Sequence, residues 1–396
     1  MTASNNLPGG NTGNSNASDS NTSSSNAGSS KTANAAGVAW AKTLRGQTSI
    51  ADAIEATRTI TAQVDSATSQ VSDGGVAGAA TNGGSENRVA QPAGAGALPT
   101  LHLGRGARYG NLTYFPVFTD APVAVRQYVT VVNSGQVGVV EQQSPSVGHL
   151  LVKNDAAMPV LLFEGTLLEG GWQHRALTHT VWVQAQSTAE IPVVCVEAGR
   201  WNGVSTQRFG NKTAPARVRR AMRGIKINAD GTARQSIADQ QDVWSEVQNF
   251  ASVTAKQNQT QSLVEIKNEL EADIAARNLV KPQPIFGQRG VLVAVAGKPL
   301  ALEVFDHPDT LAERLESILD AYLPESFAKP YIECKSQLAR DFVARVETLG
   351  VQSTEHVGRL RNKADKYVAS EALVSADGAF LHLATINPAH ELVLAA

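Results

Sequence analysis

The sequence predicts an α+β protein, in which a mainly antiparallel β-sandwich or barrel-like N-terminal half packs with a helical and mixed α/β C-terminal half. Three observations predict this class. Short apolar runs rich in Val follow one another between Pro99 and Glu197, helical spacing replaces them over 235–279, and strands and helices mix from residue 290 onward. Runs of strands followed by runs of helices are typical of α+β folds.

The apolar runs of the N-terminal half are broken by Gly, Pro, Asn and Ser, as expected of antiparallel strands joined by turns. A sandwich and a barrel both satisfy this pattern, so both remain open. The expected strands are Leu112–Phe118, Tyr128–Val132, Val137–Val140, Leu150–Val152, Val160–Phe163, Thr178–Val183 and Ile191–Val196.

Helices are expected where apolar residues recur every three or four positions. Two helices joined near Asn258 are predicted in the middle of the chain. The next helix begins at 307–309, with Asp306 or Asp309 as its cap. A further helix is predicted over Ala328–Leu349.

Two strand pairs are expected in the last third of the chain. The run 290–305 predicts two strands around a turn at Gly297-Lys298. The run 371–386 predicts a hairpin with a type I′ turn at Asp377-Gly378, because Asp-Gly readily adopts the positive φ angles of that turn.

Low-complexity composition sets the N-terminal region apart. Residues 1–36 are almost entirely Asn, Ser, Gly, Ala and Thr, a composition that buries too little apolar surface to offset backbone ordering. We therefore expect a disordered tail over 1–98, with a short helix at 49–71 that either docks on a partner or has no function. The remaining chain is divided into a β-rich domain at 99–230 and a helical and β-hairpin region at 231–396.

Composition and charge narrow the functional classes. The 396 residues carry a formal net charge of −2, which gives no electrostatic reason to expect nucleic-acid or membrane binding. Cys195 and Cys334 are the two cysteines, and they fit a reducing compartment better than a disulfide framework. The first residues lack the basic and apolar regions of a signal peptide, and no run of about 18 apolar residues occurs. A cytoplasmic location is therefore expected.

Polar, aromatic and glycine residues gather between Val160 and Trp201, where two apolar strands end. Glycines let a backbone approach a ligand, so such strand ends are common functional sites. Glu164 and Glu197 are the candidate catalytic residues, because partial burial would raise their pKa values and suit general acid–base work. Arg175 and Arg200 are candidates for binding phosphate.

The same region supplies further candidates and one simpler interpretation. Gln173 and Trp201 are predicted to position the ligand, Trp201 by stacking. In the simpler interpretation, Glu164–Arg175 and Glu197–Arg200 are structural ion pairs. Cys195 is expected to be an inert strand cysteine rather than a nucleophile.

Several other features are weaker. His174 and His179 are five residues apart, so on one strand they would face oppositely and make a poor metal site. No P-loop, GxGxxG, GxSxG or HExxH motif occurs. Asp239 is expected either to cap a helix or to reach the site. One helix after Pro215 is basic and is expected to present a solvated face, with phosphate binding as the alternative; its arginines are Arg217, Arg219, Arg220 and Arg223.

The run from Val160 to Trp201 resembles the ADP-ribosylglycohydrolase- and rhodanese-phosphatase-superfamily-associated protein domain family. The resemblance rests on an ordered set of short strings. They are Glu164-Gly165, Gly170-Gly171, Gln173-His174-Arg175 and Cys195-Val196-Glu197-Ala198-Gly199-Arg200-Trp201, with weaker matches at Asn111-Leu112-Thr113, Asp239-Gln240, Val243-Trp244, Gly287-Gln288 and Phe305-Asp306 with Pro308. Two positions depart from the family's pattern: Thr166 stands where a Glu is usual, and His174 where an Asn is usual.

The resemblance implies a place in NAD, ADP-ribose or nucleotide-phosphate metabolism. The leading hypothesis is a hydrolase-like enzyme acting on a small-molecule, nucleotide-like ligand. A non-catalytic ligand-binding or regulatory module is the alternative, favoured by Thr166, and a scaffold whose tail recruits partners is a third. The sequence indicates no particular cofactor and no oligomeric state.

Overall fold

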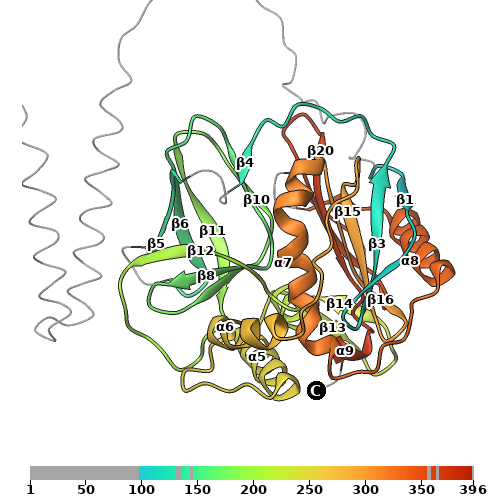
Figure 1. Cartoon of the computed structure of the whole chain (residues 1–396). Coiled ribbons are helices and arrows are strands. Elements are labelled where there is room, and N and C mark those ends of the chain that lie inside the picture. Colours follow the sequence, from blue (N-terminus) through green and yellow to red (C-terminus); the bar gives the residue numbers. More distant parts are fainter. Residues whose placement is uncertain (1–97, 131–134, 143–145, 355–357, 363–364, 395–396) are drawn as a thin grey trace, which may run out of the picture. The chain divides into compact units, whose positions relative to one another are not determined.

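The chain is described here from a computed structural model that covers residues 98–130, 135–142, 146–354, 358–362 and 365–394 (Figure 1). The predicted tail, up to residue 97, and the helix predicted at 49–71 lie outside the described residues. Among the described residues, no helix is both long enough and apolar enough to cross a membrane.

A closed antiparallel barrel forms the first layer, with strands in the order β11-β6-β5-β12-β8-β9. Of the two alternatives, the barrel is therefore correct for these strands. Its core is apolar and includes Leu150, Leu168, Leu177 and Ile191, each with none of its surface exposed. The barrel strands are β5 (Val137–Val140), β6 (His149–Asn154), β8 (Thr166–Gly170), β9 (Arg175–Leu177), β11 (Ser187–Cys195) and β12 (Thr206–Thr213).

Three short strands make a separate sheet beside the barrel, in the order β10-β7-β4. They are β4 (Val129–Thr130), β7 (Val160–Leu162) and β10 (Val181–Val183). The chain leaves β7 at Phe163 and enters the barrel at β8, so Glu164 and Gly165 lie in the turn between the two sheets.

A nine-stranded sheet contains segments from both ends of the described chain, because β3 pairs with β15, Phe115 opposite Leu292. Every residue of β15 is buried. Its alternate residues pack on two helices: Val291 and Val293 with α7, and Leu292 and Ala294 with α8. The strands are β1 (Leu101–Leu103), β2 (Ala107–Tyr109), β3 (Leu112–Thr119), β15 (Gly290–Val295), β16 (Lys298–Phe305), β17 (Gln352–Ser353), β18 (Arg359–Arg361), β19 (Ala369–Val374) and β20 (Phe380–Ile386).

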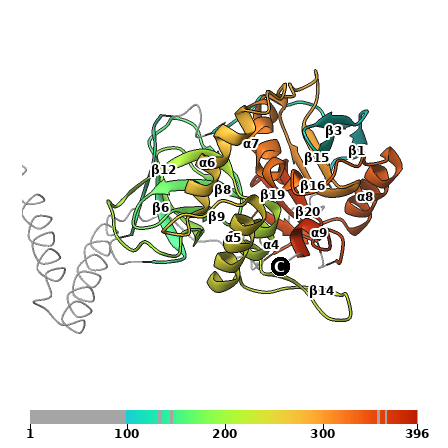
Figure 2. The ribbon, with the colours of Figure 1, turned by 60° about the horizontal axis from the view of Figure 1, so that its bottom comes forward.

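Helix α5 contacts both α4 and α6, and the three helices pack against the barrel (Figure 2). Their common core includes Leu167 of β8, Val218 of α4, Phe250 of α5 and Leu263 of α6. The helices are α4 (Ala216–Met222), α5 (Gln240–Thr254), α6 (Leu263–Ala275), α7 (Pro308–Ser326), α8 (Ser336–Leu349) and α9 (Glu391–Leu394), and a two-stranded sheet, β13 (Ile225–Ile227) with β14 (Ala233–Gln235), follows α4.

Helix starts follow local chemistry, with two corrections. Asp239 caps α5, which is one of the two roles predicted for it. Its side chain accepts a hydrogen bond from the Gln241 amide. The cap of α7 is His307 rather than Asp306 or Asp309, because its ring nitrogen accepts from the Asp309 amide. Helix α8 begins at Ser336, eight residues later than predicted from Ala328.

The hairpin of β19 and β20 is confirmed, but its predicted type I′ turn is wrong. That turn needs two consecutive residues with positive φ, and Gly378 has φ +84° whereas Asp377 is not left-handed. The Gly378 amide instead donates to the Ser375 carbonyl, in a longer loop. Positive φ occurs at two successive residues between β15 and β16, Ala296 at 49° and Gly297 at 77°.

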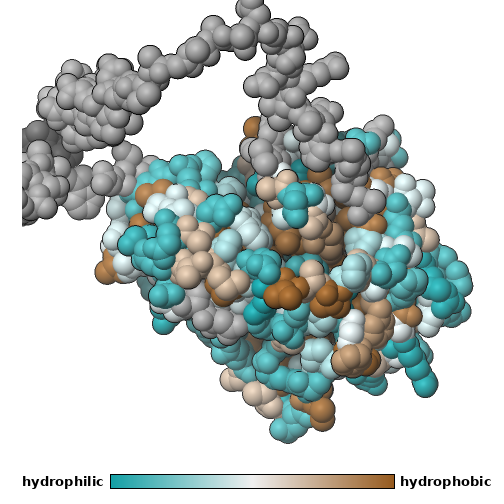
Figure 3. Space-filling view, turned by 90° about the horizontal axis from the view of Figure 1, so that it is seen from above, coloured by the Kyte–Doolittle hydropathy of each residue, from teal (hydrophilic) through white to brown (hydrophobic). Residues whose placement is uncertain are grey.

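The surface seen from above is mainly hydrophilic, with hydrophobic residues in small groups (Figure 3). Exposed apolar residues of the described chain include Phe286, Ile237 and Val280. Scattered apolar residues are usual on protein surfaces, whereas buried charges require an explanation. The buried charges are therefore the distinctive feature of this molecule.

Candidate functional site

Glu164 is buried in a cluster of arginines and is 2% exposed. It accepts hydrogen bonds from Nε of Arg219 at 3.2 Å and from Nε of Arg223 at 2.8 Å. Although burial alone would raise the pKa of Glu164, the two guanidinium groups hold that pKa well below its usual range. A carboxyl group with a depressed pKa is ionised at pH 7 and is poorly suited to be a general acid.

The basic face predicted on α4 is buried rather than solvated, which corrects that expectation. Arg217 and Arg219 have no exposed surface and Arg223 is 3% exposed. Arg219 also donates from Nη1 to Glu303 of β16 at 2.5 Å and to the Tyr322 hydroxyl of α7 at 2.7 Å. Helix α4 runs between the barrel, α5 and the large sheet, so its arginines meet buried carboxylates instead of water.

Glu197 belongs to a second, separate cluster just after β11. It has no exposed surface and pairs with Arg200, whose Nη2 lies 2.7 Å from Oε2. The His174 amide donates to the same carboxylate at 2.9 Å. Burial opposes ionisation of Glu197, but the Arg200 hydrogen bonds and the His174 amide lower its pKa.

Gln173 connects Glu197 to Arg175 and Cys195. Its amide Nε2 donates to the Glu197 carbonyl at 2.8 Å, and its Oε1 accepts from Nη1 of Arg175 at 2.7 Å. The Cys195 thiol donates to the same Oε1 at 2.9 Å. Burial raises the pKa of Cys195 to about 11, which makes its thiolate scarce at neutral pH.

The predicted convergence of both carboxylates is wrong. Glu164 lies in the turn that precedes β8 and is held by α4, whereas Glu197 follows β11 at another part of the barrel. The expected Glu164–Arg175 pair does not form; Arg175 lies instead near Glu141, 3.8 Å from its carboxylate. The Glu197–Arg200 pair is confirmed. The structure therefore brings Gln173, Arg175, Glu197 and Arg200 together and places Glu164 apart.

His174 and Ser262 add residues to the second cluster, but they form no catalytic triad. The Ser262 hydroxyl lies 2.8 Å from Nδ1 of His174, and Glu197 lies 3.7 Å from that same nitrogen. A triad places nucleophile and carboxylate on opposite ring nitrogens. Burial lowers the pKa of His174.

Trp201 marks the outer edge of this cluster. It is 57% exposed and meets Trp244 edge to face, with ring centroids 6.5 Å apart. Arg200, with 23% of its side chain exposed, is the most accessible of the charged residues here. The second cluster thus reaches solvent near Trp201, while its interior is held by mutual hydrogen bonds.

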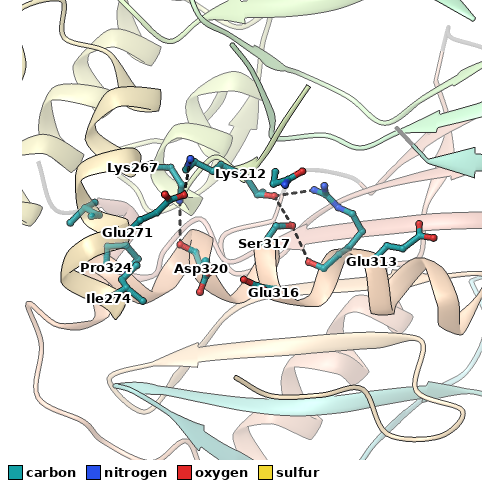
Figure 4. A pocket seen from close by; sticks show the side chains of 13 residues that line it. Lys212, Lys267, Glu271, Ile274, Glu313, Glu316, Ser317, Asp320 and Pro324 are labelled. Atoms are coloured by element: carbon teal, nitrogen blue, oxygen red, sulfur yellow. Dashed lines mark hydrogen bonds and ion pairs between the residues drawn. The ribbon is translucent and has the colours of Figure 1, made fainter. Parts of the chain in front are cut away.

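A cavity of about 330 Å³ opens between β12, α6 and α7 (Figure 4). Neither predicted carboxylate lines it. Its wall borders the Glu164 cluster through Thr213, whose methyl group lies near Gly165. The lining residues are Asn211, Lys212, Thr213, Lys267, Leu270, Glu271, Ile274, Glu313, Arg314, Glu316, Ser317, Asp320 and Pro324.

Arg314 is the distinctive group of this cavity. It is 4% exposed, and its Nη2 donates to the Thr213 hydroxyl at 3.0 Å. Its Nε is buried without a hydrogen-bond partner, and Arg314 forms no ion pair with a carboxylate in the described ranges. Burial lowers the pKa of Arg314 to about 10, against the longer-range attraction of Glu303.

Three of the four carboxylates that line the cavity pair with other bases, and Asp320 is the fourth. Glu271 pairs with Lys212 at 2.8 Å, Glu313 with Arg126 at 3.0 Å, and Glu316 with Lys281. Arg314 is attracted by Glu303 and by Glu313 of the cavity wall, but it forms no ion pair with a carboxylate that the structure describes. Buried arginines usually have an anionic partner, so Arg314 makes this cavity a candidate anion site.

Sequence reasoning missed Arg314 and Lys267, although a signal was present. Arg314 stands between Leu311 and Leu315 on the apolar stripe of α7, and Lys267 stands three residues before Leu270 on that of α6. A basic residue at helical spacing within an apolar stripe is expected to be buried with that stripe. That pattern, applied to both helices, would have pointed to the cavity.

Within the described part of the chain, no group of three or more His, Cys, Asp or Glu residues is arranged to hold a metal ion.

The position of the unusual Thr166 is also defined. It pairs with Thr213 on the neighbouring strand β12, is 2% exposed, and leaves its hydroxyl without a hydrogen bond.

The fold and its two buried clusters define an α+β protein in which a β-barrel and a nine-stranded sheet are joined through internal ion pairs. The chain belongs to the ARG and Rhodanese-Phosphatase-superfamily-associated Protein domain family, whose family model matches residues 100–386. No curated protein and no solved structure matches it. The family name links the chain to proteins associated with ADP-ribosylglycohydrolases and rhodanese-like phosphatases, which suggests a related metabolic role.

Proposed function

We propose that this chain binds a phosphate-bearing ligand of the nucleotide or ADP-ribose type in the cavity between α6 and α7. The observation that carries the proposal is Arg314, a buried guanidinium in the cavity wall that forms no ion pair with a carboxylate of the described residues. Arginine recognises phosphate through paired hydrogen bonds. A phosphate in the cavity would compensate the buried charge of Arg314.

A second hollow supports a ligand larger than phosphate. It adjoins the cavity through the shared residues Leu270, Ile274 and Pro324 and has a volume of about 190 Å³. Phe327 lies at its wall with Arg277 stacked 3.6 Å from the ring centroid. Aromatic rings and arginine planes are common platforms for bases, so the second hollow suits the base or ribose of a nucleotide.

A hydrolase-like enzyme is the second candidate function, with Glu197 as the catalytic carboxylate and Gln173, Arg175, Arg200 and Trp201 binding the substrate. One observation favours it: His174 keeps a lowered pKa beside Glu197 and next to the accessible Arg200. A neutral imidazole at pH 7 can accept a proton. The sealed position of Glu164 and its depressed pKa favour binding over catalysis.

The binding proposal is tested by thermal unfolding of the full chain with inorganic phosphate, AMP and ADP-ribose. Saturation at 100 times the dissociation constant should add roughly 2.7 kcal/mol to the free energy of unfolding. Arg314→Met should weaken binding by about tenfold or more, since a charge-assisted hydrogen bond contributes about 1.5–3 kcal/mol. Arg340→Met, on the exposed side of α8, is the matched control and should bind as the parent does.

Equal ligand stabilisation of the parent and Arg314→Met, or no stabilisation by any of the three ligands, would contradict the cavity as the binding site. The same ligands separate the two candidate functions. Turnover that is lost in Glu197→Gln, with binding retained, would establish the hydrolase. Binding without turnover would support a non-catalytic ligand-binding module.

A further inference from the structure

Lys267 is a buried amine that faces the cavity from α6. It is 6% exposed, and its Nζ donates to the backbone carbonyl of Asp320 on α7 at 3.2 Å (Figure 4). Lys267 forms no ion pair with a carboxylate among residues that the structure describes. Lysine is usually fully buried only when paired, so its position in a cavity wall calls for a function.

The Asp320 carboxyl group lines the same cavity. Its Oδ1 is buried without a hydrogen bond, while Tyr109 bonds to the side chain. Burial raises the pKa of Asp320, so its protonated form persists to higher pH than usual. The cavity is thus lined by both a carboxyl group, from Asp320, and an amine, from Lys267. Each has an unused hydrogen-bonding position.

We propose that Lys267 forms an imine with the carbonyl carbon of a phosphorylated sugar in its open-chain form, with the phosphate held by Arg314. This inference rests on the proposed binding function. The neutral amine attacks the carbonyl carbon and a carbinolamine forms. Asp320 gives its proton to the departing hydroxyl, water leaves, and the carbon–nitrogen double bond forms. No oxidant or reductant is needed.

Burial also prepares the amine for this role. Desolvation lowers the pKa of Lys267 to about 8. More of its amine is therefore unprotonated near neutral pH than for an exposed lysine. Desolvated lysines are the usual Schiff-base formers. Lys212 lines the same cavity, but its Nζ is held 2.8 Å from the Glu271 carboxylate, which keeps it charged and makes it a poor nucleophile.

The size and polarity of the cavity fit such a ligand. Its volume of about 330 Å³ is within the range of small-molecule sites, about 300–1,000 Å³. Lys267, Arg314 and Asp320 come from two facing helices. A short phosphorylated sugar can therefore meet the guanidinium with its phosphate and the amine with its carbonyl.

Reductive trapping tests the inference on the full chain. Ribose 5-phosphate and sodium borohydride are added, and the adduct is located by intact mass and peptide mapping. We expect one adduct per chain, at Lys267, lost in Lys267→Arg and retained in Lys212→Arg. Ribose without phosphate should label at least tenfold less. Labelling should increase between pH 7 and pH 9.

Adducts spread over exposed lysines, or an adduct at Lys212 alone, would overturn the inference, and peptide mapping of the parent decides this even if Lys267→Arg fails to fold. Failure of the proposed function is distinguishable. If phosphate and ADP-ribose stabilise the parent but no adduct forms at Lys267, the imine is wrong and the binding site stands. If neither ligand stabilises the parent, the binding proposal itself fails.

Discussion

Glu303 of β16 accepts a 2.5 Å hydrogen bond from Nη1 of Arg219 on α4. Both side chains are buried, and Arg219 also holds Glu164. This one arginine therefore connects the turn that enters the barrel to the centre of the nine-stranded sheet. Glu164, which the sequence predicts to be catalytic, therefore belongs to a buried ion-pair network that connects the barrel to the large sheet.

Removing the Glu303 carboxylate from Arg219 should lower the free energy of unfolding. Glu303→Gln leaves Arg219 with less compensation, and breaking a buried ion pair typically costs about 3–5 kcal/mol. Urea unfolding of the parent and the variant measures the loss. The control is Glu169→Gln, whose partner Arg208 has an 81% exposed side chain, and it should cost at most about 1 kcal/mol. Equal losses of unfolding free energy in the two variants would contradict a stabilising role for the buried Arg219–Glu303 ion pair.

Stability should fall in acid. The folded-state pKa values of Glu303 and Glu371 are lowered from 4.5 to about 2, against the effect of burial, by Arg219 and His179 respectively. Their stabilising contribution is present above pH 4.5 and is lost as the pH falls through about 2. Each pKa unit corresponds to about 1.4 kcal/mol.

Unfolding free energies measured between pH 6 and pH 2 check this dependence. Glu303→Gln should be less stable at pH 6 but should lose less stability toward pH 2 than the parent does. A variant whose acid slope equals that of the parent would show that Glu303 is not ionised in the native protein.

Both thiols should be unreactive in the folded chain. Cys195 has no exposed surface and Cys334 is 2% exposed, and burial raises each pKa to about 11. A disulfide reagent at pH 8 should modify neither thiol in buffer and both in urea. Rapid modification of Cys195 in buffer would instead restore it as a candidate nucleophile.

Gly165 should resist substitution. Its φ is +79°, and an added Cβ would lie 3.2 Å from Cδ of Arg219, next to Glu164. Gly165→Ala should cost about 1–2 kcal/mol. Gly138→Ala is the control, because φ there is not left-handed and open space surrounds its Cβ position. Thermal unfolding compares them, and a Gly165→Ala protein as stable as Gly138→Ala would contradict the strain.

Thr166→Glu should occupy the anion site from within. Thr166 lies opposite Thr213, which accepts from Arg314, and cross-strand side chains are about 5 Å apart. A carboxylate there would neutralise Arg314, so phosphate should no longer raise the melting temperature. Thr166→Val is the matched control and should retain the phosphate effect. A phosphate effect preserved in Thr166→Glu would place the anion elsewhere.

Local pattern alone was enough to predict many elements. Short apolar runs between turn residues predict β5 and β6, helical spacing predicts α5 and α6, and the position of Asp239 predicts a helix cap. The Glu197–Arg200 pair follows from the simpler interpretation of the sequence, because its members are only three positions apart along the chain. Each of these features depends on neighbours close along the chain, which the sequence displays directly.

Tertiary structure alone decided where the buried charges lie. Glu164 and Arg219 are 55 residues apart, and Arg219 and Glu303 are 84 apart, so no local pattern could pair them. The same holds for the cavity, whose walls come from β12, α6 and α7. The sequence determined which segments become strands and helices, because those depend on periodicity. Their packing determined which cations meet a carboxylate and which, like Arg314, do not.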